Sequence, residues 1–192
     1  MHIYKCLSVT IRHIIMAGVH YDILIEDERR NLTQVALLIL DLTPKAMRRL
    51  ATLVHTSWTP RAIRCHYLRC TDKMNEQLKL TKNEKEMYMN PGDGFINCDT
   101  SFLYKIIRNY DLVIRPTHKW GAKVRVISNS GDIVETLREL RNCVVHRPHV
   151  SFREHELHNL YVDMRSIIEK MTRFTENNDL QIHIDNYLPN AY

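Results

Sequence analysis

Hydrophobic residues recur every three or four positions along most of this chain, which is the spacing that places side chains on one side of an α-helix. The clearest stripe follows position 151, where Ser151-x-x-Glu154 forms a capping pattern for a helix start. The stripe predicts one long helix whose buried side consists of Leu157, Leu160, Tyr161, Met164, Ile167, Ile168 and Met171.

Signals for helix starts divide the preceding chain into shorter helices. Small polar residues accept hydrogen bonds from the free N–H groups of a first helical turn, and proline suits that turn because its missing N–H is not needed there. The starts predicted on this basis are Asn31, Thr43-Pro44, Thr59-Pro60, Thr81-x-x-Glu84, Asp99 or Thr100, and Asp132-x-x-Glu135. The side chains that these helices would bury include Val35, Ile39, Met47, Leu50, Leu53, Val54, Ile63, Tyr67, Phe102, Leu103, Ile106, Ile107, Tyr110, Ile133, Leu137, Leu140 and Val144.

The fold predicted from this pattern is an all-α helical bundle. No segment has the alternating pattern of a strand, and five Gly and six Pro leave little material for the turns of a β-sandwich. Residues 31–175 are expected to form one helical domain. Residues 1–30 form an N-terminal extension, expected to be helical although β-branched residues weaken its stripe, and residues 176–192 form a loosely held tail.

Cysteine usage and hydropathy indicate the cytoplasm. The five cysteines are odd in number and form no C-x-x-C pair, which fits a reduced intracellular protein. The longest unbroken apolar run covers residues 35–40, whereas a membrane span needs about 20 apolar residues. The N-terminal apolar stretch is interrupted by basic and His residues and lacks the organised regions of a signal peptide. We therefore expect a cytoplasmic protein that does not enter a membrane.

Positive charge is concentrated in two parts of the chain. The net charge is only +5, but residues 42–71 contain six basic residues and no acidic one, and residues 105–125 contain six against one, Asp111. Such stretches can neutralise phosphates and attract a polyanion. A solvated helix face or an acidic protein partner is the alternative explanation. If RNA is the partner, the candidate contacts are Arg48, Arg49, Lys119, Trp120, Lys123 and Arg138.

The strongest candidate for chemistry is the end of the helix expected to begin at Asp132. Arg141, Asn142 and His146 bring together a phosphate-binding cation, a carboxamide and a proton-transfer group. Asn142 and His146 are four apart and so share a helix face, and Pro148 predicts that the helix ends close to His146. An alternative role for the Arg and the His is to bond the last carbonyls of the helix. The same Arg–His spacing, without the Asn, occurs at Arg61/His66 and Arg153/His158.

Spacing at the same place would also allow a zinc site. Cys143, His146 and His149 lie three apart, and two more histidines follow. No Cys pair anchors such a site, however, and Pro148 interrupts the helix face, so no metal is predicted. The chain also lacks a Gly-rich phosphate loop, and no cofactor is expected.

Several segments, taken in their order along the chain, resemble one branch of the HEPN superfamily. They are residues 95–109 (FINCDTSFLYKIIRN), 118–121 (HKWG) and 132–142 (DIVETLRELRN), with further similarity at 36–55 and 80–91. The branch is named after DAZ-interacting zinc finger protein three, an RNA-binding ubiquitin ligase. The segment after Trp120-Gly121 departs from the family pattern because it lacks the usual proline.

The resemblance implies a HEPN-like helical bundle that forms a homodimer around the Arg–His helix. In HEPN ribonucleases the Arg, the polar residue after it and the His line a composite cleft, and the matching residues here are Arg141, Asn142 and His146. It implies metal-independent RNA cleavage, in which the ribose 2′-hydroxyl attacks the adjacent phosphate and leaves a 2′,3′-cyclic phosphate end. The alternative is a non-catalytic RNA-binding or dimerisation module of a longer protein of ubiquitin-ligase or innate-immune type, because many HEPN domains bind without cleaving.

Overall fold

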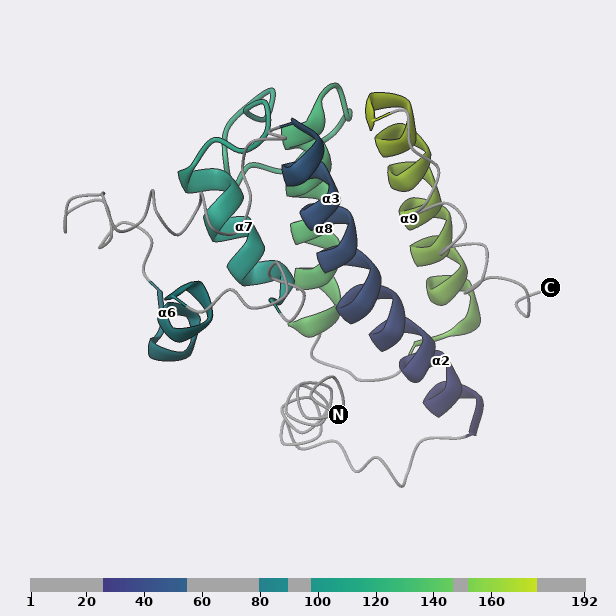
Figure 1. Ribbon diagram of the computed structural model, residues 1–192. Helices are drawn as coiled ribbons and strands as arrows, with labels where there is room; N and C mark the ends of the chain where they lie inside the picture. The colour runs from purple at the N-terminus through teal and green to yellow at the C-terminus, as the bar shows by residue number, and fades with distance from the viewer. Residues whose placement is uncertain (1–25, 55–79, 90–97, 147–151, 176–192) are drawn as a thin grey trace.

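The computed structural model describes residues 26–54, 80–89, 98–146 and 152–175 (Figure 1), and within these segments it contains helices and no strand. The predicted all-α class is therefore confirmed. The helices, labelled as in Figure 1, are α2 (Glu26–Leu37), the π-helical segment η2 (Leu38–Leu42), α3 (Thr43–Val54), α6 (Lys82–Met89), α7 (Thr100–Asn109), α8 (Ser130–Val145) and α9 (Glu154–Thr175).

Helix α8 occupies the middle of the bundle. It packs against α3, α7 and α9, and α3 in turn packs against α7 and α9. In Figure 1, α8 lies behind α3 and runs from the upper to the lower end of the bundle, with α7 on its left and α9 on its right. Both ends of α8 therefore reach an end of the bundle, and its first turn is buried whereas Cys143 and His146 at its last turn are exposed.

The core is built from the apolar stripes that the sequence predicted. All of the predicted α9 positions are buried, and so are the predicted stripe residues of α7 from Phe102 to Ile107. Val35, Ile39, Met47 and Leu50 are each 0% exposed. Leu140, Val144 and Tyr110 are partly buried at the edge of this core. Burial of apolar surface stabilises the fold by about 25 cal/mol per Å², so these stripes supply the main driving force for packing.

The helices α2, η2 and α3 follow one another without a break, and two predicted helix starts within them are wrong. Asn31 lies inside α2, where its side-chain Nδ2 donates to the carbonyl of Phe152 at 3.0 Å. Thr43 has helical backbone angles (φ −64°, ψ −43°), and its hydroxyl contacts the Ile39 carbonyl. Because Pro44 has no N–H and would crowd the carbonyl four residues back, a wider π turn directly before it lets the helix continue.

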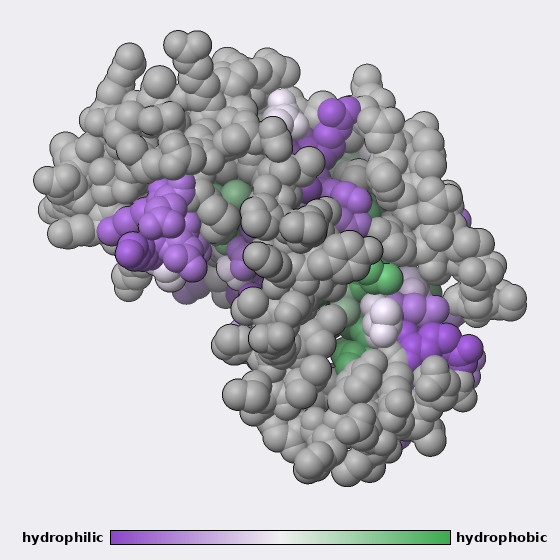
Figure 2. Space-filling model, turned by 60° about the horizontal axis from the view of Figure 1, so that its bottom comes forward, coloured by the Kyte–Doolittle hydropathy of each residue, from purple (hydrophilic) through white to green (hydrophobic). Residues whose placement is uncertain are grey.

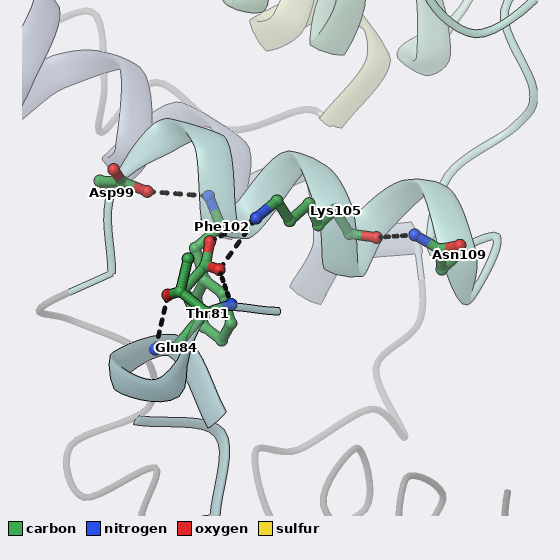
Figure 3. Close-up of polar contacts among 6 residues, drawn as sticks. All are labelled: Thr81, Glu84, Asp99, Phe102, Lys105 and Asn109. Carbon is green, nitrogen blue, oxygen red and sulfur yellow. Dashed lines mark hydrogen bonds and ion pairs between the residues drawn. The ribbon is translucent and has the colours of Figure 1, made fainter. Parts of the chain in front are cut away.

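The helix starts at α6 and α7 agree with the sequence (Figure 3). Glu84 Oε2 accepts from the Thr81 N–H at 2.7 Å, and Thr81 Oγ1 accepts from the Glu84 N–H at 3.3 Å, which is the reciprocal capping box. The helix that follows ends at Met89, as predicted. Of the two candidates for the next cap, Asp99 is the one used: its Oδ1 accepts from the Phe102 N–H at 2.8 Å.

The start of α9 differs from the prediction, because the acidic residue that bonds back to the residue before the helix is Glu156 and not Glu154. The helix begins at Glu154, and Glu156 Oε2 accepts from the N–H of Arg153 at 3.0 Å. Ser151, the predicted cap, falls outside the described residues. The helix predicted at Thr59-Pro60, residues 1–25 of the N-terminal extension and the tail at 176–192 also lie outside the described residues, whereas residues 26–30 of the extension are helical and belong to α2.

Candidate functional site

The Arg–His motif lies on the last turn of α8 and faces solvent. Arg141 and Asn142 are partly exposed, and His146 is exposed. His146 is the residue that ends the helix, with φ −99° and ψ 13°, and its backbone N–H still donates to the Asn142 carbonyl at 3.0 Å. The helix therefore ends at the position expected from Pro148, at the lower end of α8 in Figure 1.

Asn142 bonds Arg141 within this motif. Its Oδ1 accepts from Arg141 Nη1 at 3.2 Å. Among the described residues, the imidazole of His146 has no hydrogen-bond partner. The carboxamide therefore orients the guanidinium in this structure, and the contact that the sequence suggested, from Asn142 to His146, is not made.

The opposite end of α8 is organised by two buried carboxylates, Asp132 and Glu135, which the sequence assigned to a capping pattern. That assignment is wrong, because the helix begins at Ser130 and is capped by Asn129, whose side chain accepts from the Asp132 N–H at 3.0 Å. Both carboxylates lie inside the helix and point at the loop before it. The segment 111–129, which joins α7 to α8, is called the basic loop below.

Asp132 fixes the two halves of the basic loop to each other. Its Oδ1 accepts from the Thr117 N–H at 2.8 Å, and its Oδ2 accepts from the Thr117 hydroxyl at 2.6 Å and from the Ser128 N–H at 2.9 Å. Burial alone raises the pKa of Asp132, but these hydrogen bonds from Thr117 and Ser128 outweigh burial, so the pKa lies below its ordinary value.

Glu135 is fully buried and joins three parts of the molecule. Its Oε1 accepts from the Tyr104 hydroxyl of α7 at 2.5 Å and from the Gly121 N–H of the basic loop at 2.6 Å, and its Oε2 accepts from Arg138 Nε at 2.7 Å. Burial, and then the hydrogen bond to Glu135, raise the pKa of Tyr104, so this hydroxyl remains a donor.

Two of the predicted RNA contacts, Trp120 and Arg138, belong to this cluster. Trp120 packs edge-on against the ring of Tyr104, with 5.7 Å between the ring centroids, and its indole Nε1 is buried without a hydrogen-bond partner among the described residues. Arg138 lies 5.4 Å from the centroid of the Tyr104 ring while it pairs with Glu135. Trp120 thus packs the loop against α7, whereas Arg138 joins α8 to α7, and each side chain is still partly exposed.

The remaining RNA candidates separate into an exposed pair and a half-buried pair. Lys119 and Lys123 are exposed on the basic loop. Arg48 and Arg49 are partly buried on α3. Burial lowers the pKa of Arg48, and the nearby Cys98 and Asp41 offset part of that effect, so Arg48 lies against its own protein. Lys119 and Lys123 are the better placed of the four to meet a phosphate.

The structure does not bring all the predicted site residues together. An α-helix rises about 1.5 Å per residue, so Glu135, which holds the basic loop, lies about 16 Å along α8 from His146. Arg138 and Arg141 lie between these two points. The candidate site is thus an extended surface along α8, with the motif at one end and the exposed lysines at the other.

The contacts of Asp132, Glu135 and Tyr104 with the loop and with each other were not predicted from the sequence. A weak signal was present: two acids at the start of a helix, directly after a basic loop that carries a single acid of its own. Gly131 was another missed residue, because a Cβ built there would lie 2.2 Å from the Ile114 carbonyl oxygen. Only glycine lets the loop backbone cross the start of α8 so closely.

The described segments contain no candidate metal site, no disulfide and no candidate membrane span. No group of three or more His, Cys, Asp or Glu side chains is placed to hold a metal ion in that part of the chain, and His149 falls outside it. The two cysteines that the structure describes, Cys98 and Cys143, are free thiols, the first buried and the second exposed. None of the described helices combines the length and the apolar character that crossing a membrane requires.

A comparison of the chain with protein-family models, with curated proteins and with solved structures finds no match in any of the three. The helical class of the protein is established by the structure. The resemblance to the HEPN superfamily stays a prediction that depends on the segments quoted from the sequence.

Proposed function

We propose that this protein is an RNA-directed HEPN-like domain that cleaves RNA without a metal ion. The observation that supports this proposal is the placement of Arg141, Asn142 and His146 together on the solvent-facing last turn of the central helix α8. An exposed histidine at the helix end supplies proton transfer, and a guanidinium held by Asn142 on the same stretch of helix supplies phosphate binding.

The proposed reaction is transfer of a phosphodiester within the RNA strand. The 2′-oxygen forms a bond to the adjacent phosphorus and loses its proton, while the bond from phosphorus to the 5′-oxygen breaks and the 5′-oxygen gains a proton. His146 accepts or donates one of these protons, and Arg141 stabilises the negative charge that develops on the phosphorane. The products are a 2′,3′-cyclic phosphate end and a 5′-hydroxyl end, and DNA is inert because it has no 2′-hydroxyl.

The test is incubation of the purified protein with labelled single-stranded RNA in EDTA. We expect His146→Ala to lose essentially all cleavage, and Asn142→Ala to keep RNA binding but lose most cleavage. Arg141→Ala should lose both binding and turnover, because the guanidinium meets the phosphate in the ground state and in the transition state. The matched control is His158→Ala, because Arg153, directly before α9, and His158 on α9 have the same spacing without the Asn. Cleavage by all three α8 variants at the wild-type rate would contradict the assignment.

A second candidate is a non-catalytic RNA-binding or dimerisation module. The observation in its favour is that Asn142 bonds Arg141 and leaves the His146 imidazole without a partner among the described residues. In the same assay, this module would bind RNA or form a dimer, and the wild-type protein would leave the RNA intact.

A further inference from the structure

The basic loop (residues 111–129) carries exposed positive charge that other described residues do not neutralise. Lys119, Lys123 and Arg125 are exposed, and none of them forms an ion pair with another described residue. The acid of the loop, Asp111, is already paired with Arg115 at 2.9 Å. A surface with three such cations attracts phosphates.

The loop is fixed in place before any ligand arrives. Asp132 accepts two hydrogen bonds from Thr117 and one from Ser128, and Glu135 accepts one from the Gly121 N–H, so these two carboxylates alone tie the loop to α8 by four hydrogen bonds. Gly121 has φ +83°, a conformation that favours glycine, and it directly follows Trp120 in the packed cluster. A loop ordered in advance loses less conformational entropy when it binds than a loose one.

The position of Glu135 is unexpected for a phosphate-binding surface. A buried negative charge directly beneath the loop opposes the binding of an anion by Coulomb repulsion. Its bonds, however, connect the loop at Gly121 to Arg138, which lies one turn before Arg141 on α8. If Glu135 acts mainly through its charge, removal of that charge should strengthen RNA binding. If it acts mainly by holding the loop, the same change should weaken RNA binding.

We propose that the basic loop binds phosphates of the RNA strand on one side of the cleavage site. Glu135 is then a positioning residue, because it holds the loop in the conformation that binds these phosphates. This inference rests on the proposed function, because it names a second part of the same RNA site. The loop and the motif lie about 16 Å apart along α8, which corresponds to about five nucleotides at 3.4 Å per nucleotide of a helical strand. RNA of ten nucleotides should therefore bind more tightly, and with a steeper salt dependence, than RNA of three.

The experiment compares Glu135→Gln with Glu139→Gln by fluorescence anisotropy, using labelled ten-nucleotide single-stranded RNA. Each variant removes one negative charge from α8 beside Arg138, but only Glu135 bonds the loop. We expect Glu135→Gln to weaken RNA binding by about fivefold or more, as loss of two phosphate contacts would. Glu139→Gln should leave binding unchanged or strengthen it. Strengthening by both variants would overturn the inference, because charge alone would then explain the result.

A double-mutant cycle tests whether Glu135 acts through the loop. Lys119→Gln with Lys123→Gln should weaken binding and reduce the slope of log K against log salt by about 0.7 per lost contact. In the Glu135→Gln background the same pair should have little further effect, because the loop is no longer held in place. Full additivity of the two changes would assign Glu135 a purely structural role and overturn the inference.

Limited trypsin digestion monitors the loop without RNA. Cleavage after Lys119, Lys123 or Arg125 should be faster in Glu135→Gln than in Glu139→Gln, with both variants still folded by circular dichroism. Tyr104→Phe, which removes one of the three donors to Glu135, provides a milder variant if Glu135→Gln does not fold.

If the wild-type protein binds no RNA, the proposed function and the inference both fail. If RNA binds but an acidic peptide competes equally, or loop cleavage does not change, only the inference fails.

Discussion

At the residue scale, the most informative side chains are the two carboxylates that the sequence assigned to a helix start. Asp132 and Glu135 are 1% and 0% exposed, and between them they accept hydrogen bonds from the loop, from α7 and from α8. Removal of a partner from a buried charged group costs about 1.5–3 kcal/mol for each hydrogen bond to it. These two positions therefore tolerate substitution far less well than their solvent-exposed neighbours.

The low pKa of Asp132 predicts how stability varies with acid. The folded state binds fewer protons at this group than the unfolded state, so its contribution is present above the ordinary value of 3.8 and is lost as pH falls through the lower, folded pKa. We expect the wild-type melting temperature to fall more steeply below about pH 4 than that of Asp132→Asn. At pH 7 the variant should be less stable by about 2 kcal/mol.

Thermal melts between pH 7 and pH 3, followed by circular dichroism, measure this difference. Asp163→Asn is the control, because Asp163 is exposed on α9 and its replacement leaves the basic loop untouched. Identical pH profiles for the wild type and Asp132→Asn would show that the hydrogen bonds from Thr117 and Ser128 do not hold the charged form.

At the element scale, α6 shows how one side chain can both start a short helix and attach it. Glu84 completes the capping box with Thr81, and its carboxylate also pairs with Lys105 Nζ of α7 at 2.7 Å (Figure 3). Burial alone raises the pKa of Glu84, but the bonds from Lys105 and Thr81 outweigh it and lower the pKa. Among the α6 residues whose exposure the structure gives, Lys82, Asn83 and Glu86 are exposed, and hydrophilic residues are visible at the left of the face shown in Figure 2.

Substitutions at the α6 cap should therefore loosen this helix and leave the rest of the bundle intact. Thr81→Ala should destabilise α6 by about 1 kcal/mol, and Glu84→Gln by more, because it weakens both the cap and the pair with Lys105. Hydrogen exchange by mass spectrometry measures protection in residues 82–89, with Glu86→Gln on an exposed position of α6 as the control. Equal loss of protection in α8 would mean that α6 and the core unfold together.

At the scale of the whole molecule, the motif lies at one end of the described bundle, and the resemblance to HEPN ribonucleases implies a composite cleft formed by two copies. We expect a two-fold homodimer with the C-terminal ends of both α8 helices near the axis. Cys143 is exposed on α8, three positions before His146, so a bifunctional maleimide should join two protomers there. Light scattering measures the mass, and in a background with Cys6, Cys65 and Cys70 replaced by Ser, Cys143→Ser is the control that should lose the cross-link. A strict monomer at tens of micromolar would contradict the dimer.

Local sequence signals determined the helical class, the buried stripe of α9, the caps of α6 and α7 and the end of α8 at His146. These features depend on periodicity and on hydrogen bonds between residues at most four apart, so the chain near each one suffices to specify it. The same local signals also selected Arg141, Asn142 and His146 as neighbours on one helix turn.

Tertiary structure alone decided where the other polar residues act. Thr43-Pro44 has the sequence of a helix start, but packing of a continuous helix against α7 and α8 favours a π turn over a break. Asp132 and Glu135 have the spacing of a cap, but a loop that folds back over α8 supplies better donors to both. A carboxylate accepts hydrogen bonds from donors that the folded chain brings within about 3 Å. The Gly121 and Tyr104 donors to Glu135 lie 14 and 31 positions away in the sequence, so local spacing does not reveal them.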